Sequence, residues 1–273
     1  MSTQFLAREG GRIAFDDTGS GPLVVCVPGM GDLRAEYRFL TPQLIAAGYR
    51  VVTVDVRGHG ETSVGWRDVS VGAIGSDIVA LVRHLNAGPA IIIGTSMAAG
   101  AAVCAAAEAP DAIVGLVLIG PFVRDTMLGW QRSAMFNPMF QRPWGVGIWS
   151  RYFATLYPTA RPADWDVYTA AQTSNLREKG RLEALRGMMV ATKQASEAAL
   201  SKVNAPTLVV MGTKDPDFND PAAEAKLVAD RLHGRVQMID GAGHYPHAEM
   251  PAPTGAAIIA FLSTLQEAAR HVA

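Results

Sequence analysis

The part of the sequence that most constrains the fold is a short apolar run followed at once by a run of small residues. Residues 90–93 are Ala-Ile-Ile-Ile, a pattern typical of a fully buried strand. This strand ends at Gly94, and the mostly alanine residues 98–107 predict a helix. Because very few residues join the strand to the helix, the chain must turn sharply between them.

Ser96 lies in this sharp turn, within the pentapeptide Gly94-Thr95-Ser96-Met97-Ala98. A serine there is forced outward, so its hydroxyl lies at the carboxyl edge of the sheet with the N-terminus of the helix behind it. This is the geometry of a nucleophile elbow, Gly-x-Ser-x-Gly. Gly94 obeys that pattern, and Ala98 replaces the second glycine with another small residue. Ser96 is therefore the candidate nucleophile.

The rest of the chain predicts an α/β fold with a mostly parallel, doubly wound, eight-stranded sheet. Two alternating segments joined by Gly10-Gly11 predict an antiparallel hairpin at one edge. Beyond the hairpin, strands alternate with helices, which implies right-handed crossovers and helices on both faces. The expected strands cover residues 4–8, 12–17, 23–27, 50–56, 90–93, 114–119, 207–211 and 235–239. The expected helices cover about 35–47, 70–85, 98–107, 221–232 and 256–269.

The alternation of strands and helices stops between Pro121 and about Ser201, where no segment resembles a strand. This stretch holds more than half of the aromatic residues, and residues 176–200 predict a helix. We interpret residues 121–201 as a helical cap insertion that lies over the sheet. The remaining residues, 1–120 and 202–273, then form the α/β core domain.

Chemically useful side chains follow several of the expected strands. In open α/β sheets, ligands bind beyond the carboxyl ends of the strands. Ser96 follows one strand, Asp215 and Asp217 follow another, and His244 follows the last one. A serine, an acid and a histidine are therefore expected at one edge of the sheet, in that order along the chain.

These loops carry a resemblance to a known family. They are the elbow at 94–98, Gly-Thr-Lys-Asp at 212–215, Gly-Ala-Gly-His at 241–244 and Asp-Val-Arg-Gly-His-Gly at 55–60. The chain resembles α/β-hydrolase-fold enzymes over nearly its whole length, in the serine esterase and haloperoxidase-like branch with a helical cap. One departure is Pro28, which stands where relatives often carry histidine.

The roles expected of the candidate residues follow from their chemistry and from this resemblance. A serine hydroxyl is a weak nucleophile and needs an adjacent base. His244 is expected to take the proton of Ser96 and later deliver it to the leaving group, while Asp215 holds the imidazole in the right tautomer. The resemblance implies an oxyanion hole made by the backbone N–H groups of Met30 and Met97. Met97 opens a helix, so its N–H lacks a partner within the helix.

Two other residues are alternatives for these roles, and a third, His59, lies in one of the matching loops. Asp217 lies two residues beyond Asp215 and is an alternative acid. His247 lies three residues beyond His244 and is an alternative base, although the Gly-x-Gly-His turn favours His244. His59 is expected to brace its own loop rather than to take part in the chemistry.

The expected substrate follows from the catalytic residues and from the aromatic cap. Part of the cap's aromatic residues should line the pocket, and Trp130, Phe136, Trp149 and Phe153 are the candidates for substrate binding. The leading hypothesis is a serine hydrolase that cleaves a carboxylic ester or lactone with apolar groups through an acyl-enzyme. One alternative is a carbon–carbon bond hydrolase or a cofactor-free perhydrolase resembling haloperoxidases, and another is a signalling protein that senses a small molecule.

Composition narrows the partners that are expected. A net charge of −1 offers no electrostatic footprint for nucleic acid or an anionic membrane. No apolar signal segment and no run of spanning length is present, so a cytoplasmic location is expected. Cys26 and Cys104 lack metal-ligand spacing, and neither a metal nor a cofactor is expected. The expected partner is a small apolar ester-like substrate, and a homodimer remains open.

Overall fold

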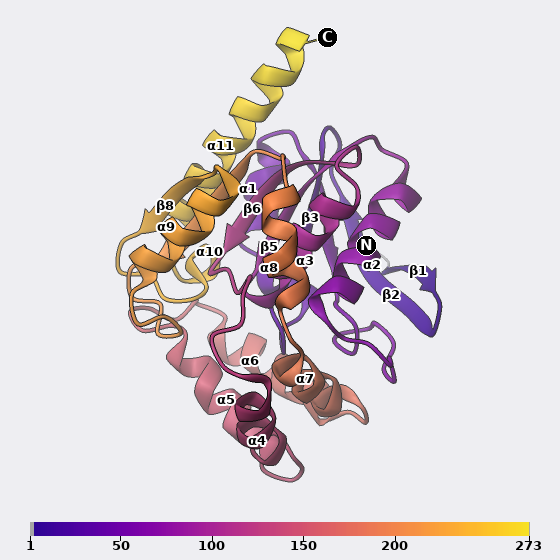
Figure 1. Ribbon diagram of the computed structural model, residues 1–273, viewed down its shortest axis with the longest axis vertical. Coiled ribbons are helices and arrows are strands. Elements are labelled where there is room, and N and C mark those ends of the chain that lie inside the picture. The colour runs from indigo at the N-terminus through magenta and orange to yellow at the C-terminus, as the bar shows by residue number, and fades with distance from the viewer. Residues whose placement is uncertain (1–2, 273) are drawn as a thin grey trace.

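The computed structural model describes residues 3–272, in which eight strands form a single sheet (Figure 1). The strand order is β1-β2-β4-β3-β5-β6-β7-β8. β2 pairs antiparallel with β1 and with β4, whereas each other neighbouring pair among these strands is parallel. The predicted mostly parallel eight-stranded sheet is confirmed. The strands are β1 (Gln4–Arg8), β2 (Gly11–Thr18), β3 (Leu23–Val27), β4 (Arg50–Val54), β5 (Ala90–Thr95), β6 (Ile113–Ile119), β7 (Thr207–Gly212) and β8 (Arg235–Ile239).

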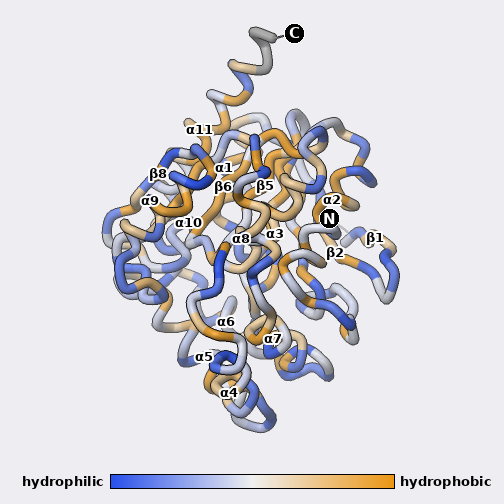
Figure 2. The backbone as a smooth tube through the Cα atoms, viewed as in Figure 1, coloured by the Kyte–Doolittle hydropathy of each residue, from blue (hydrophilic) through white to orange (hydrophobic). Residues whose placement is uncertain are grey.

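Helices cover both faces of this sheet, and each face has its own apolar layer. Along β3, Val25 belongs to one layer and Val24 to the other, as the alternation of side chains along a strand requires. The first layer includes helices α2 (Val71–Leu85), α3 (Met97–Glu108) and α9 (Pro221–Leu232). The second includes α1 (Leu40–Ala46) and α11 (Pro251–Val272). Figure 2 shows the hydrophobic residues gathered in these inner layers.

Local signals explain where several helices begin. The side chain of Asp220 accepts a hydrogen bond from the N–H of Ala223 at 2.9 Å, which caps α9. The helix predicted over 35–47 is wrong in its first half, because the chain forms a 3₁₀ turn at Arg34–Tyr37 and α1 starts only at Leu40. Pro42 lacks an N–H, so it fits the first turn of a helix but not its interior.

A group of helices is inserted between β6 and β7. They are α4 (Gly129–Met139), α5 (Gly145–Thr155), α6 (Trp165–Arg177), α7 (Arg181–Val190) and α8 (Gln194–Ala199). Figure 1 shows α4 to α7 at the end of the body farthest from the C-terminus, while α8 lies beside α3. The continuous helix predicted over 176–200 is wrong. α6 ends at Arg177 because Glu178 is extended, Gly180 with φ of 88° stands directly before α7, and Ala191 is extended after it.

An aromatic cluster joins these helices to the sheet. Phe153 of α5 packs against Tyr245, which lies between β8 and α10 (Pro246–Glu249), with ring centroids 5.4 Å apart. Trp149 and Tyr168 are buried in the same cluster. Within residues 3–272, no helix has both the length and the apolar character needed to cross a bilayer.

Candidate active site

A cavity of about 330 Å³ lies between the carboxyl ends of the strands and helices α4 and α5. Ser96, His244 and Met30 line it from the side of the sheet, and Phe136 and Trp149 line it from the inserted helices. Its size falls at the small end of the range for ligand sites in proteins. Ser96 and His244, which the sequence predicts at one edge of the sheet, therefore both lie on the wall of one cavity.

The backbone of Ser96 is strained in the way an elbow requires. Its φ of 56° and ψ of −121° lie outside the regions that side-chain-bearing residues prefer, and such strain persists only where the surrounding structure enforces it. Gly94 makes the turn possible, because a Cβ there would stand 2.5 Å from the carbonyl oxygen of Ala98. Ala98 itself is fully buried, so the second small residue of the motif is also required.

His244 and Asp215 form a buried pair beside this serine. Nδ1 of His244 lies 2.7 Å from Oδ2 of Asp215, and Oδ1 of that carboxylate accepts the backbone N–H of Asp217 at 3.0 Å. Phe122 links the pair to the elbow, since its N–H donates to the carbonyl of Ser96 at 3.2 Å and its ring centroid lies 5.9 Å from that of His244. Burial lowers the pKa of His244, but the charge and hydrogen bond of Asp215 outweigh burial and raise it to about 9.

Asp217 is held in a different way from Asp215. Both of its carboxylate oxygens accept the hydroxyl of Tyr152, at 2.7 and 2.8 Å, and its Oδ2 stays 3.7 Å from Nδ1 of His244. Burial raises the pKa of Asp217, although His244 and Tyr152 lower it in part. The imidazole is therefore hydrogen-bonded to Asp215, and Asp217 lies beyond that distance.

The glycine-rich loop after β3 leaves one backbone donor unused. The N–H of Gly29 donates to Oε2 of Glu36 at 2.9 Å, and the N–H of Gly31 donates to Nε2 of His59 at 3.1 Å. Within the described chain, neither Met30 nor Met97 has an acceptor for its N–H, and both residues lie beside Ser96. Two free backbone donors next to a serine are what an oxyanion hole requires.

His59 contacts this loop, which the sequence did not indicate. Burial lowers the pKa of His59 to about 4, so the ring is neutral at physiological pH. Its Nδ1 lies 3.0 Å from the carbonyl of Arg57, which assigns the proton to that nitrogen and leaves Nε2 free to accept from Gly31. His59 therefore braces the loop that carries Met30, in addition to its own.

His247, the alternative base, lies away from the cavity. Its ring stacks on Tyr37 with centroids 5.1 Å apart. Nε2 of His247 lies 3.0 Å from Oε1 of Glu36, an electrostatic contact without the alignment of a hydrogen bond. Glu36 thus connects His247 to Gly29 from behind the loop.

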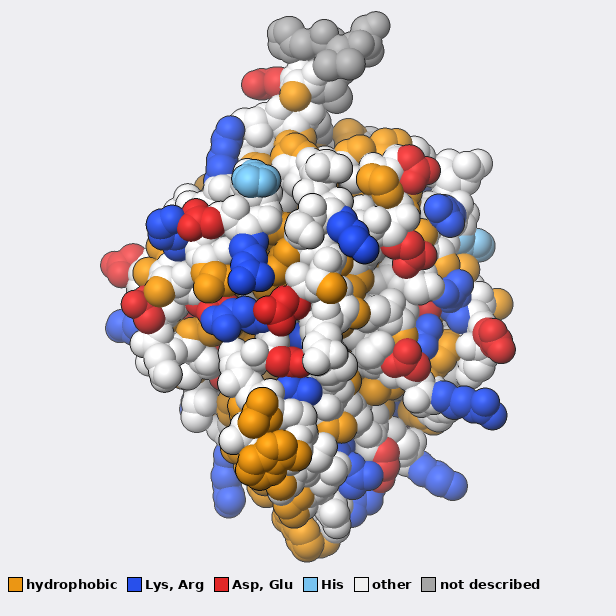
Figure 3. All heavy atoms as spheres, in the orientation of Figure 1, with side chains coloured by type: hydrophobic (Ala, Val, Ile, Leu, Met, Phe, Trp, Pro, Cys, Tyr) orange, Lys and Arg blue, Asp and Glu red, His pale blue; other side chains and the backbone are white. Residues whose placement is uncertain are grey.

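The four aromatic residues considered for substrate binding fall into three places. Phe136 and Trp149 line the cavity. Phe153 is buried in the aromatic cluster, where its ring stacks on that of Trp165 at 5.7 Å. Trp130 on α4 is 69% exposed, and Leu128 just before this helix and Met135 on it are exposed as well. Figure 3 shows a hydrophobic patch over this helix. Trp130 and Phe153 do not line the cavity.

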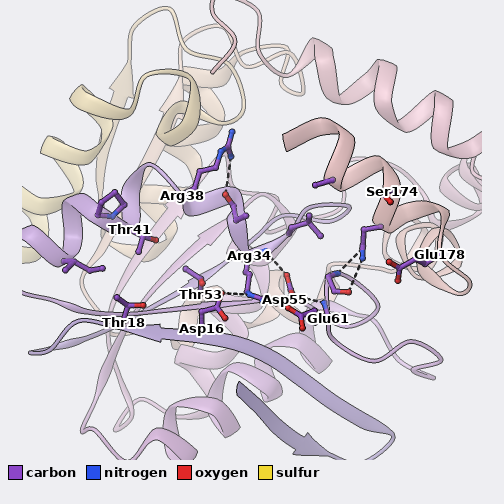
Figure 4. Close-up of a pocket in the computed structure, with 17 residues that line it drawn as sticks. Asp16, Thr18, Arg34, Arg38, Thr41, Thr53, Asp55, Glu61, Ser174 and Glu178 are labelled. Atoms are coloured by element: carbon purple, nitrogen blue, oxygen red, sulfur yellow. Dashed lines mark hydrogen bonds and ion pairs between the residues drawn. The ribbon is translucent and has the colours of Figure 1, made fainter. Parts of the chain in front are cut away.

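A larger hollow of about 870 Å³ lies elsewhere, between the start of α1 and α6 (Figure 4). Its central cation, Arg34, donates to the carboxylates of Asp16, Asp55 and Glu61. Ser96, Asp215 and His244 are not among the residues that line it. The smaller cavity is therefore the candidate active site, in spite of its size.

One group of side chains in the described part of the chain has the spacing of metal ligands. Asp215, Asp217 and His244 each offer a ligand atom, all within 4.8 Å of one another. Hydrogen bonds within the protein already engage these atoms, since Nδ1 of His244 bonds Asp215 and Tyr152 bonds Asp217. The arrangement fits a proton relay better than a metal centre.

Sequence patterns did not single out two further groups of site residues. Arg132 and Lys193 are buried cations that line the cavity, although each falls in a polar helical stretch where a solvated residue is the usual expectation. Gly120 lies against the His244–Asp215 pair, and its place directly after a strand was the available signal.

The fold agrees with that of known proteins. The profile of the alpha/beta hydrolase family matches residues 24–257. The 2-(acetamidomethylene)succinate hydrolase of Mesorhizobium japonicum is 29% identical over 273 residues, which cover 96% of each chain. A thermophilic esterase from Thermogutta terrifontis superposes with a TM-score of 0.81 at 22% identity, covering 97% of this chain and 99% of the esterase. A bromoperoxidase from Bacillus anthracis has a TM-score of 0.83 at 20% identity, covering 96% of this chain and all 100% of the bromoperoxidase.

The chain therefore belongs to the alpha/beta hydrolase family. The family match spans the elbow serine, the acid loop and the histidine loop. The similarity to the esterase and the bromoperoxidase concerns the fold, which hosts several chemistries. The reaction must be argued from the side chains at the cavity.

Proposed function

We propose that this chain is a serine hydrolase that cleaves a carboxylic ester or lactone through a Ser96–His244–Asp215 triad and an acyl-enzyme. The observation that carries the proposal is the elbow conformation of Ser96 on the wall of the cavity that His244 also lines, with Nδ1 of His244 held by Asp215 at 2.7 Å. A serine, a base and an orienting acid in this relation are the components of nucleophilic acyl transfer.

The mechanism follows from the state of each group. Asp215 fixes the proton on Nδ1 of His244, which leaves Nε2 as the base for the hydroxyl of Ser96. Attack on the carbonyl carbon places a negative charge on the carbonyl oxygen, and the free N–H groups of Met30 and Met97 would donate to it. His244 then protonates the leaving alcohol, and a water activated by His244 releases the acid.

Helices α4 to α7 would act as the cap over this reaction. Phe136 and Trp149 give the cavity an apolar wall, and Met139 and Met189 on α4 and α7 add flexible apolar side chains to it. Such a wall suits an apolar acyl or alcohol group. It also removes water from the site, which strengthens the electrostatic contacts that stabilise the transition state.

Ser96→Ala tests the proposal with p-nitrophenyl butyrate as the substrate. We expect kcat to fall by at least roughly 10⁴-fold, the scale seen when triad serines are removed. Ser174→Ala is a matched control, because Ser174 is exposed and lines only the larger hollow. Retained turnover in Ser96→Ala would eliminate Ser96 as the nucleophile.

Labelling with a fluorophosphonate, set beside ester turnover, separates the alternatives. If a fluorophosphonate labels Ser96 but no ester is cleaved, carbon–carbon bond hydrolysis or perhydrolysis at the same triad becomes the better assignment. If neither labelling nor turnover occurs while a small molecule raises the melting temperature strongly, the cavity serves as a sensor.

A further inference from the structure

Lys193 is a buried cation without a partner at the wall of the candidate active site. It lies directly before α8, only 7% of its surface is exposed, and it lines the same cavity as Ser96 and His244. Among the described residues, its Nζ forms no hydrogen bond and no ion pair, whereas its backbone N–H donates to Asp125. Buried lysines are rarely left unpaired, because removing an ammonium group from water is costly.

The nearby acids are already engaged by other groups. Asp125 forms an ion pair with Arg132, with Oδ1 and Nη1 2.8 Å apart. It also accepts the hydroxyl of Thr192 at 2.6 Å and the backbone N–H of Lys193 at 3.0 Å. Arg124, which lines the cavity too, is paired with Glu224. One positive charge, that of Lys193, is left over at this end of the cavity.

The opposite end of the cavity does not supply the missing anion. Asp217 is the other acid on the wall, and both of its oxygens accept the hydroxyl of Tyr152 near His244. Arg132 adds a second positive charge beside Lys193, although its Nη1 is paired with Asp125 and its Nε is buried without a partner in the described chain. The ammonium group of Lys193 is therefore the unused donor that this end of the cavity offers to a ligand.

Electrostatics and packing support the same interpretation. Burial lowers the pKa of Lys193, Arg132 lowers it further, and Asp125 only partly opposes them, so a further anion would be stabilised there. Lys193 also lies on the side of the cavity near the elbow. Ser196, one turn beyond Lys193, is within 3.1 Å of the position that a Cβ on Gly100 would take, one turn beyond Ser96.

We propose that Lys193, assisted by Arg132, forms a carboxylate-binding subsite, and that the natural substrate is an ester or lactone that carries a free carboxylate. This inference rests on the proposed function and names its substrate class. The apolar wall holds the carbon chain, the reacting carbonyl meets Ser96, and the second carboxylate of the substrate neutralises the charge of Lys193. A cavity of about 330 Å³ suits a small molecule of this kind.

The test compares two esters of equal length that differ only in the distant carboxylate. Monomethyl adipate and methyl hexanoate, and likewise monomethyl glutarate and methyl pentanoate, are hydrolysed under pH-stat control, and the ratio of their kcat/KM values is determined. We expect the wild-type chain to favour the carboxylate-bearing member of at least one pair by roughly tenfold or more, the scale of a hydrogen bond to a charged group.

Variants at Lys193 identify the source of that preference. Lys193→Met keeps the length and apolar stem of the side chain and should lower the ratio by roughly 10- to 100-fold, mainly by raising KM for the carboxylate ester. Lys193→Arg retains the charge and should keep most of the preference. Lys202→Met, at an exposed lysine outside the cavity, is the matched control and should leave the ratio unchanged.

The outcomes separate this inference from the proposed function. If wild-type ratios stay near one, or if Lys193→Met leaves the ratio unchanged, the carboxylate subsite is wrong while ester hydrolysis by Ser96 still stands. If no ester is hydrolysed, calorimetric titration with adipate and with glutarate decides. Binding that is lost in Lys193→Met supports the subsite, and absence of binding to the wild-type chain overturns it.

Discussion

Gly120 lies directly against the imidazole of His244, at the end of β6. A Cβ at this position would stand 2.9 Å from Nδ1 and Cε1 of the ring and 3.3 Å from Oδ2 of Asp215. Real Cβ atoms are almost never found closer than 3.0 Å to such a neighbour. The space for the buried pair therefore depends on a glycine that is distant in sequence from both partners.

The first prediction is that Gly120→Ala abolishes most of the activity. The φ of 52° at this position disfavours alanine, and the added methyl group must displace the ring of His244 from Asp215. We expect kcat to fall by about 10²-fold or more and the free energy of unfolding to fall by roughly 1–3 kcal/mol. Gly88→Ala, at a glycine with φ of 83° and open space around it, is the control for strain alone.

The second prediction separates the two candidate acids. Asp215→Asn should lower kcat by roughly 10⁴-fold, as replacing the acid of the serine protease triad does, because the imidazole loses its orienting charge. Asp217→Asn should lower it by less than about tenfold, since Asp217 bonds Tyr152 rather than His244. Steady-state hydrolysis of p-nitrophenyl butyrate measures both, and the reverse order of effects would assign the acid role to Asp217.

The third prediction concerns stability against pH. The pKa of His244 is raised from 6.5 to about 9 in the folded chain, so folding favours the protonated imidazole. The stabilisation that His244 gives the folded chain is fully present below about pH 6.5 and is lost as the pH rises through about 9. Urea unfolding between pH 6 and 10 should show that the free energy of unfolding of the wild-type chain declines as pH rises. This decline should be smaller in His244→Gln. If the free energy of unfolding fell equally with pH in the two proteins, the pKa of His244 would not be raised by folding.

The same pKa shift affects activity. The base must be neutral to accept the proton of Ser96. The value of kcat/KM for a neutral ester should therefore rise with pH and level off above an apparent pKa near 9. An apparent pKa near 6.5 in this profile would show that Asp215 does not stabilise the protonated ring of His244.

The fourth prediction concerns the support behind the loop after β3. Glu36→Ala leaves the N–H of Gly29 and the ring of His247 without their acidic partner. We expect a loss of roughly 2–4 kcal/mol in the free energy of unfolding, and a fall of about tenfold in kcat because Met30 is the next residue. Glu36→Gln keeps an acceptor for Gly29 and should lose less of both. A stability for Glu36→Ala within about 1 kcal/mol of wild type would contradict this account.

Local sequence was sufficient for the sheet and for the elbow. The continuous apolar run before Gly94 and the alanines after Ala98 leave a single arrangement, in which strand and helix nearly collide at Ser96. Parallel strands then bring their carboxyl ends to one edge, so the acid and the histidine could be placed near the serine from their positions after β7 and β8.

The inserted helices could not be predicted to the same depth. Which face of a helix points to a cavity depends on the elements packed around that helix. Phe153 and Trp130 are both aromatic, yet Phe153 is buried in the aromatic cluster and Trp130 lies on the surface. The predicted helix 176–200 is interrupted at Glu178 and Ala191, which are extended, and at Gly180, which adopts a left-handed conformation. Lys193 is informative only because tertiary packing buries it, which no local pattern indicates.

The most direct test of the triad is the rate at which a fluorophosphonate modifies the protein, followed by intact mass and peptide mapping. We expect one equivalent of label on Ser96 in the wild-type chain, and a labelling rate at least roughly 10³-fold lower in His244→Gln because the serine then lacks its base. Label on another residue, or an equal rate in the two proteins, would contradict a relay between Ser96 and His244.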